Sequence, residues 1–187
     1  MLKFDKIQYV VLNEEREEVK FISEISYIKT VTERDSDGRT TTKTYSVSGD
    51  MLITNYNLDG DLIWLTHIDK YYIISSSPSS FVSNLMLLGY STTTYKENEG
   101  NIYLMFNDQK KKEEYKEAGI GKGVYYSVDV SKINPQGEED RFVITHTNKN
   151  YKRARFDGCS SGISDNGYLI LNFLKGRKYN WATAKVW

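Results

Sequence analysis

The amino-acid sequence predicts an all-β protein whose antiparallel strands form a single β-rich domain over residues 1–187, alone or as part of a larger assembly. Turn signals rich in Gly, Asn and Asp recur about every 10 to 25 residues and separate short apolar runs. The 15 tyrosines and many β-branched residues suit pleated sheet surfaces. Because no long amphipathic helical pattern interrupts these runs, we expect about three to four degenerate, propeller-like blades, with a β-sandwich or an open barrel as the alternative.

The clearest element is a β-hairpin between residues 49 and 72. Apolar runs at 51–56 and 62–68 flank a turn in which Asp59-Gly60 supplies the positive φ that a tight hairpin needs. Before this hairpin we expect strands at residues 6–12, 19–32 and 40–47. The acidic cluster at residues 14–18 fits a solvated turn between the first two of these strands.

After the hairpin, the serine-rich residues 75–80 form the plainest loop signal in the chain. Further strands are expected at residues 82–95, 102–106, 124–130, 142–147, 153–156, 168–174 and 181–187. Gly49, Gly100 and Gly167 each precede an apolar run, so we expect a turn at each that launches a strand. The charged segment 108–118, DQKKKEEYKEA, has a helical composition, and we expect a short helix there.

The composition narrows the functional classes. Lys and Arg together number 25, and so do Asp and Glu, which gives no overall attraction to nucleic acid or to an anionic membrane. Cys159 is the single cysteine, which excludes an intrachain disulfide and a cysteine-built zinc site. No apolar run reaches the roughly 20 residues that span a bilayer, and the first residues lack a signal-peptide pattern. We expect no cofactor and no membrane span.

One segment resembles a catalytic motif. Gly158–Gly162, GCSSG, matches the string G-x-S-x-G of a nucleophile elbow. An elbow requires a helix after it and a histidine later in the chain, whereas His67 and His146 both precede it. A pair of Cys159 with either histidine is the other conceivable nucleophile. We therefore expect no enzyme, and we keep a hydrolase that uses Ser160 or Cys159 as the competing hypothesis.

Residues 55–61, NYNLDGD, imitate the start of an oxygen-ligand calcium loop through their alternating Asn and Asp. Thr66 stands where the closing bidentate glutamate of an EF-hand would fall. A hairpin turn explains the same residues, so we expect no metal site.

The candidate binding residues are Tyr151, Lys152, Arg153, Arg155, Trp181 and Trp187. The first four combine cations with an aromatic ring, a composition that stacks bases and neutralises phosphates. The same residues on a strand edge would protect against aggregation, so we favour a solvated edge and keep a nucleic-acid or polyanion-binding domain as an alternative function. The two tryptophans lie in the last predicted strand, which we expect to be an edge or closing strand.

Residues 56–64, YNLDGDLIW, resemble the hairpin of bacterial β-propeller repeats of the PQQ-like and SBBP type. In those repeats a tryptophan follows the turn glycine by four residues, as Trp64 follows Gly60 here. Residues 125–144 are a weaker echo, with Phe142 near the place of the tryptophan. The resemblance implies an exported bacterial protein. Together with the absence of a catalytic constellation, it predicts a binding or scaffolding module that pairs with a protein partner, or with itself, through sheet edges.

Overall fold

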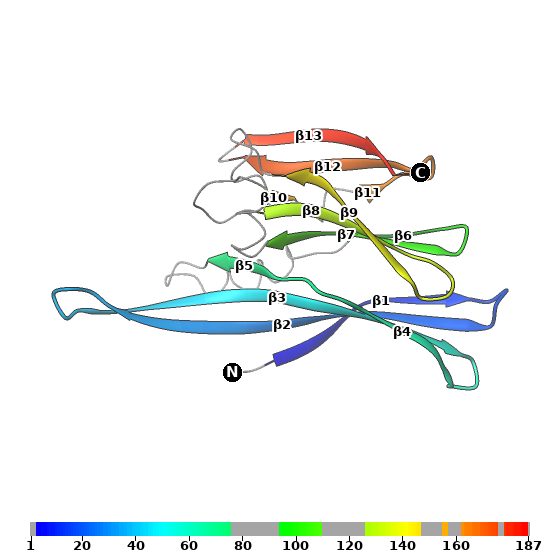
Figure 1. The fold of residues 1–187 in the computed structure, drawn as a ribbon, viewed down its shortest axis with the longest axis horizontal. Coiled ribbons are helices and arrows are strands. Elements are labelled where there is room, and N and C mark those ends of the chain that lie inside the picture. Colours follow the sequence, from blue (N-terminus) through cyan, green and yellow to red (C-terminus); the bar gives the residue numbers. More distant parts are fainter. Residues whose placement is uncertain are drawn as a thin grey trace.

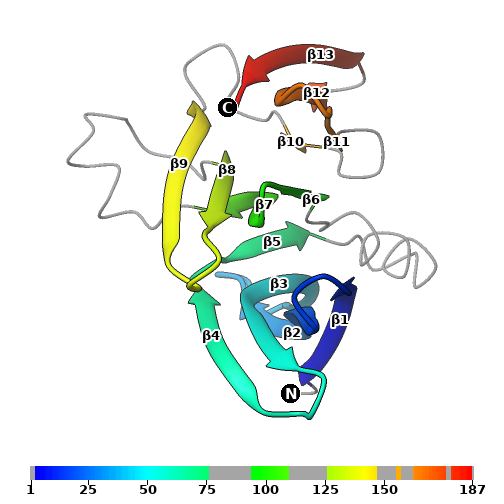
Figure 2. The ribbon, with the colours of Figure 1, turned by 90° about the vertical axis from the view of Figure 1, so that its right-hand side faces the viewer.

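The computed structural model describes residues 3–75, 94–109, 126–146, 155–156, 162–175 and 178–186. These residues form three antiparallel sheets and contain no helix, which confirms the predicted all-β class. Figure 1 and Figure 2 show the sheets lying one above another, with the N-terminal sheet at the bottom and the C-terminal sheet at the top. The middle layer is the sheet formed by residues 94–146.

The first sheet has the strand order β1-β2-β3-β4, with β5 beside β3. Its strands are β1 (Lys3–Asn13), β2 (Glu18–Arg34), β3 (Thr40–Asn57), β4 (Leu62–Ile68) and β5 (Tyr72–Ser75). The predicted hairpin is confirmed as β3–β4, and Gly60 has a φ of 94° in its turn. Beyond Tyr27, β2 pairs only with β3 among the described strands, and this end of the hairpin projects past the other sheets (Figure 1).

Gly49 does not follow a turn, contrary to the sequence prediction, because it lies inside the continuous strand β3. Two β3 residues, Gly49 and Asp50, stand opposite the single residue Ile25 of β2, which makes a β-bulge. A Cβ atom at Gly49 would lie 3.2 Å from the Ile25 carbonyl oxygen, so this bulge favours glycine. The bulge divides β3 into a part that pairs with β4 and a part that pairs with β5.

The second sheet has the order β6-β7-β8-β9. Its strands are β6 (Thr94–Asn98), β7 (Asn101–Gln109), β8 (Tyr126–Ile133) and β9 (Glu139–His146). The short helix expected over residues 108–118 is wrong at Asp108 and Gln109, because both residues continue β7 and pair with β8. Residues 110–118 lie outside the described part of the chain. The turn expected at Gly100 is confirmed, since Gly100 has a φ of 77° between β6 and β7.

The third sheet is built around β12 (Tyr168–Lys175), which pairs with β13 (Lys178–Lys185) along its whole length. The short strands β10 (Arg155–Phe156) and β11 (Gly162–Ile163) pair with the two ends of β12. The turn expected at Gly167 is also confirmed, because Gly167 has a φ of 73° immediately before β12.

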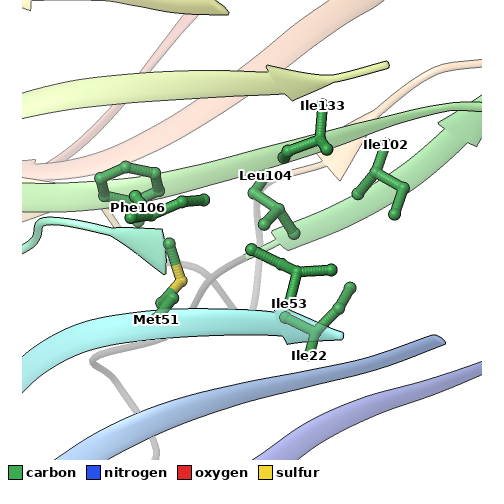
Figure 3. Packing of buried hydrophobic residues seen from close by; sticks show 8 residues of the cluster. Ile22, Met51, Ile53, Ile102, Leu104, Phe106 and Ile133 are labelled. Carbon is green, nitrogen blue, oxygen red and sulfur yellow. The ribbon is translucent and has the colours of Figure 1, made fainter. Parts of the chain in front are cut away.

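Two apolar cores separate the three layers. The core between the first and second sheets comprises Ile22, Met51, Ile53, Ile68, Ile102, Leu104, Phe106 and Ile133 (Figure 3). The core between the second and third sheets comprises Tyr103, Met105, Val128, Val130, Ile163 and Leu169. Successive β7 residues therefore contact different neighbours, which explains why the run 102–106 is apolar at every position rather than at every second one.

Candidate functional site

The first sheet exposes apolar side chains on the face that points away from the second sheet. Strand registers place these side chains in two rows, one of Leu12, Val19, Tyr56 and Leu62, the other of Val10, Phe21, Thr54 and Leu65. We refer to the seven apolar members, all of these except Thr54, as the outer apolar face. Its outermost side chains are half exposed, at 59% for Val10 and 51% for Leu65. In its middle, Phe21 and Tyr56 contact edge to face, with ring centroids 5.9 Å apart.

Strand β2 carries its polar residues on the opposite, inner face. Lys20 and Glu24 are buried there beside Ile22, whereas Val19 and Phe21 lie half-buried on the outer apolar face. A shift of one residue in register would exchange the two faces of the strand. The observed register therefore needs partners for the buried charges, and these partners come from other parts of the chain.

Lys70, in the connection between β4 and β5, provides the partner of Glu24. Its Nζ atom donates to Ser48 Oγ at 2.7 Å and lies 3.2 Å from Glu24 Oε1, and the Ser48 hydroxyl also hydrogen-bonds Glu24. Burial lowers the pKa of Lys70, and the Glu24 carboxylate offsets only part of this effect. The Lys70 backbone N–H donates to Asp50 Oδ1 in the bulge at 3.2 Å. These bonds hold the β4–β5 connection against β2 and β3.

Arg141 of β9 makes the corresponding connection from the second sheet. Its Nη2 atom donates to Asp108 at 2.8 Å and to Asp129 at 2.7 Å, and its Nη1 atom donates to the Asp69 carbonyl at 2.6 Å. Burial opposes the charge of Arg141, but the carboxylates of Asp129, Asp108 and Glu139 together outweigh it, so the pKa of Arg141 is raised. The Arg141 guanidinium lies 5.0 Å from the centre of the Phe106 ring. Asp129 is 0% exposed, and the bond to the Asp69 carbonyl joins this network to the β4–β5 connection of the first sheet.

A second polar cluster is buried near the start of β2. Lys20 and Asn55 stand directly opposite each other on β2 and β3, and they are 2% and 0% exposed. Asn55 Nδ2 donates to Glu18 Oε2 at 3.0 Å, and Lys20 Nζ lies 3.7 Å from the same oxygen. Glu97 of β6 lies 3.8 Å from Lys20 Nζ and accepts a hydrogen bond from Tyr95. Neither Lys20 Nζ nor Asn55 Oδ1 has a hydrogen-bond partner among the described residues.

Comparisons with protein-family models, with curated proteins and with solved structures found no match. The resemblance of residues 56–64 to propeller repeats therefore stays a prediction. Within the described ranges, no helix has the length and apolar character needed to cross a membrane. The same residues contain no group of three or more His, Cys, Asp and Glu side chains placed to hold a metal ion.

The candidate binding residues fall mostly outside this part of the chain. The residues outside it are Tyr151, Lys152, Arg153 and Trp187. Arg155 lies in β10 and Trp181 in β13, so the structure puts them in one sheet but on opposite sides of β12. Trp181 is 74% exposed, and Tyr168 and Ile170 on the neighbouring strand are also exposed. Among the described strands β13 pairs with β12 alone, so Trp181 lies on an edge strand.

The structure also describes parts of the elbow-like string and the calcium-like segment, and the position of Trp64. Residues 158–161 of the elbow-like string lie outside the described ranges, and Gly162 begins strand β11 where an elbow requires a helix. In the calcium-like segment, Asn57 Oδ1 accepts a hydrogen bond from the Asp61 N–H at 2.7 Å, which closes the hairpin turn. Trp64 packs against the first core, and its Nε1 atom donates to the Pro135 carbonyl at 3.1 Å.

Sequence reasoning missed the outer apolar face, although a signal for it exists. Residues 9–12, YVVL, and 62–65, LIWL, are apolar at consecutive positions. Consecutive residues of a strand point to opposite faces, so such runs require apolar surroundings on both sides. The second sheet provides these surroundings on one side of β1 and β4.

Proposed function

We propose that this chain is a non-catalytic binding or scaffolding module of stacked, propeller-like β-sheets that contacts a protein partner through the outer apolar face. The observation that carries the proposal is the orientation of β2, which buries Lys20 and Glu24 and directs Val19 and Phe21 outward. Contiguous exposed apolar patches on soluble proteins mark interaction sites. The simplest partner that this geometry supports is a second copy of the chain.

The edges of the first sheet add a second means of contact. Strands β1 and β4 flank the outer apolar face, and among the described strands each pairs on one side only, with β2 and β3 respectively. Their outer edges carry backbone N–H and C=O groups that an added strand can satisfy. An approaching copy can thus bury apolar side chains and extend the sheet at the same place.

Light scattering of the purified chain over a concentration series tests this proposal. We expect wild-type mass above that of a monomer, and a monomer for Leu65→Lys. Losing the burial of one leucine costs about 1.5–3 kcal/mol, so the dissociation constant should rise at least about tenfold. Thr41→Lys is the matched control, because Thr41 is exposed on the projecting end of β3, away from the outer apolar face, and this variant should associate like the wild type.

Other results would contradict this interface or favour an alternative. A wild-type chain that remains monomeric at every concentration would contradict self-association through this face. If Trp181→Lys dissociates the oligomer and Leu65→Lys does not, the β13 edge is the interface. Binding to single-stranded DNA that weakens steeply with salt would favour the nucleic-acid alternative, because such a dependence reports phosphate contacts.

A further inference from the structure

We propose that Lys20 and Asn55 form an intramolecular isopeptide cross-link between β2 and β3, with Glu18 as the acid–base group. The two residues are directly opposed in the sheet register, where Cβ atoms are about 4.5–5.5 Å apart. Glu18 Oε2 contacts both reacting groups, at 3.0 Å from Asn55 Nδ2 and 3.7 Å from Lys20 Nζ. An amine, a carboxamide and a carboxylate thus meet in one buried cluster.

One of the two unsatisfied atoms of this cluster, Lys20 Nζ, is the nucleophile of the cross-link, and the other, Asn55 Oδ1, belongs to the carboxamide that it would attack. Lys20 Nζ and Asn55 Oδ1 are buried without a hydrogen-bond partner among the described residues. Buried polar groups normally have partners, and exceptions call for a specific explanation. Cross-linking converts the ammonium, with its three donors, into a neutral amide with a single N–H. Lys70, the other fully buried lysine among the described residues, already donates to Ser48 and pairs with Glu24 at 3.2 Å, so its ammonium has partners.

The reaction needs no external reagent. Lys20 first gives one proton to Glu18, which frees the lone pair of the amine. The amine lone pair then attacks Cγ of Asn55 and forms the Nζ–Cγ bond. Nδ2 takes up the proton that the attacking amine loses, the Cγ–Nδ2 bond breaks and Nδ2 leaves as ammonia. The protonated Glu18 then gives its proton to the ammonia, which becomes ammonium. One ammonium ion is released for each amide formed, and Glu18 is regenerated.

The residues around the Lys20–Asn55 amide would shield it, and the amide would stabilise the pairing of β2 with β3. Tyr95 donates to Glu97 beside the cluster and packs against Tyr9, with ring centroids 5.3 Å apart. Burial of Lys20 and Asn55 limits the access of water to the amide that they would form. The chain has one cysteine and so cannot tie these strands with an internal disulfide. An amide between β2 and β3 would restrain the unfolded chain as a disulfide does. It would also hold together the open end of the β2–β3 hairpin, whose opposite, turn end projects beyond the other sheets (Figure 1).

Intact mass spectrometry of the denatured wild-type chain is the primary test. We expect a mass lower than that of the sequence by one ammonia, and a branched tryptic peptide that contains both Lys20 and Asn55. Lys20→Arg and Asn55→Ala should have their full sequence mass. Lys43→Arg is the matched control, because Lys43 is an exposed lysine on the same sheet, and it should retain the loss of ammonia.

A time course after cell-free synthesis tests the role of Glu18. General acid–base groups contribute about 10²–10⁴-fold, so Glu18→Gln should form the cross-link at least about a hundredfold more slowly. Equal rates in this variant and the wild type would remove Glu18 from the reaction. A wild-type chain with its full sequence mass, whose Lys20 amine is acetylated after unfolding, would overturn the cross-link. A loss of ammonia that maps to Asn166-Gly167, as a succinimide, would overturn it equally. These readouts on the wild type remain decisive if Asn55→Ala does not fold.

Discussion

Replacement of Lys70 by methionine should destabilise the fold strongly, because it leaves the Glu24 carboxylate buried without its cationic partner. The two charged atoms lie 3.2 Å apart, and both side chains are 0% exposed. At an effective dielectric constant of about 20, two charges at this separation interact by about 5 kcal/mol. Removing one member of a buried pair costs about 3–5 kcal/mol, which is a large part of the roughly 5–15 kcal/mol that stabilises a typical protein.

Urea unfolding in a double-mutant cycle measures this effect. We expect Lys70→Met and Glu24→Leu each to lower the unfolding midpoint, and the double variant to recover most of the loss, since apolar side chains then replace both charges. Lys43→Met is the matched control, because Lys43 and Glu33 form an ion pair whose side chains are 47% and 54% exposed. Exposed pairs contribute little, so its midpoint should barely change.

The pH dependence of the same variants provides an independent check. Burial lowers the folded-state pKa of Lys70 below its ordinary value of 10.5, so between the two values the unfolded chain binds more protons than the folded chain. Through this group the stability of the wild type rises with pH, and the cost of Lys70→Met should be larger at about pH 9.5 than at about pH 7. The reasoning is refuted if Lys70→Met unfolds at the same urea concentration as Lys43→Met, or if the double variant is less stable than both single variants.

Two further predictions concern single positions. Gly137→Ala should lower the thermal midpoint more than Gly60→Ala, because both residues have positive φ but only at Gly137 would a Cβ atom lie 2.7 Å from the Trp64 ring; equal shifts would contradict this reading. Burial raises the pKa of Tyr95 above its ordinary 10.0, so above that pH the unfolded chain loses this proton first and stability falls. Tyr95→Phe should lose less stability than the wild type between about pH 10 and pH 11 in urea unfolding, and an equal loss would exclude the effect.

The positions of strands such as β3 and β4 could be predicted because the signals that set them are local. In the central hairpin, Gly60 takes up the positive φ of the turn, and Asn57 bonds to Asp61 within the same five residues. The helix prediction failed where local composition competes with distant contacts. Asp108 accepts a hydrogen bond from the Tyr71 N–H at 2.9 Å and forms an ion pair with Arg141. Its position in β7 therefore depends on residues that are far away in the sequence.

The buried charges could not be predicted for a related reason. Lys20 and Glu24 are residue types that normally face water, and in an alternating strand they indicate the solvated face. Lys20 pairs with Glu97 and Glu24 pairs with Lys70, and both partners lie in other parts of the chain. No local sequence pattern predicts these pairs. Only the three-dimensional arrangement shows that the polar face of β2 points inward.

The orientation of β2 also connects the fold with the proposed function. In β7, Ile102 and Tyr103 both pack in apolar cores because a sheet covers each side of the strand. In β2 the inner face is covered by the second sheet, while Val19 and Phe21 remain half-buried. Ion pairs on the inner face hold this register, because a slip by one residue would turn Lys20 and Glu24 outward and leave their partners, among them the buried Lys70, unpaired. A second copy on the outer apolar face would therefore give β2 the doubly covered environment that β7 already has.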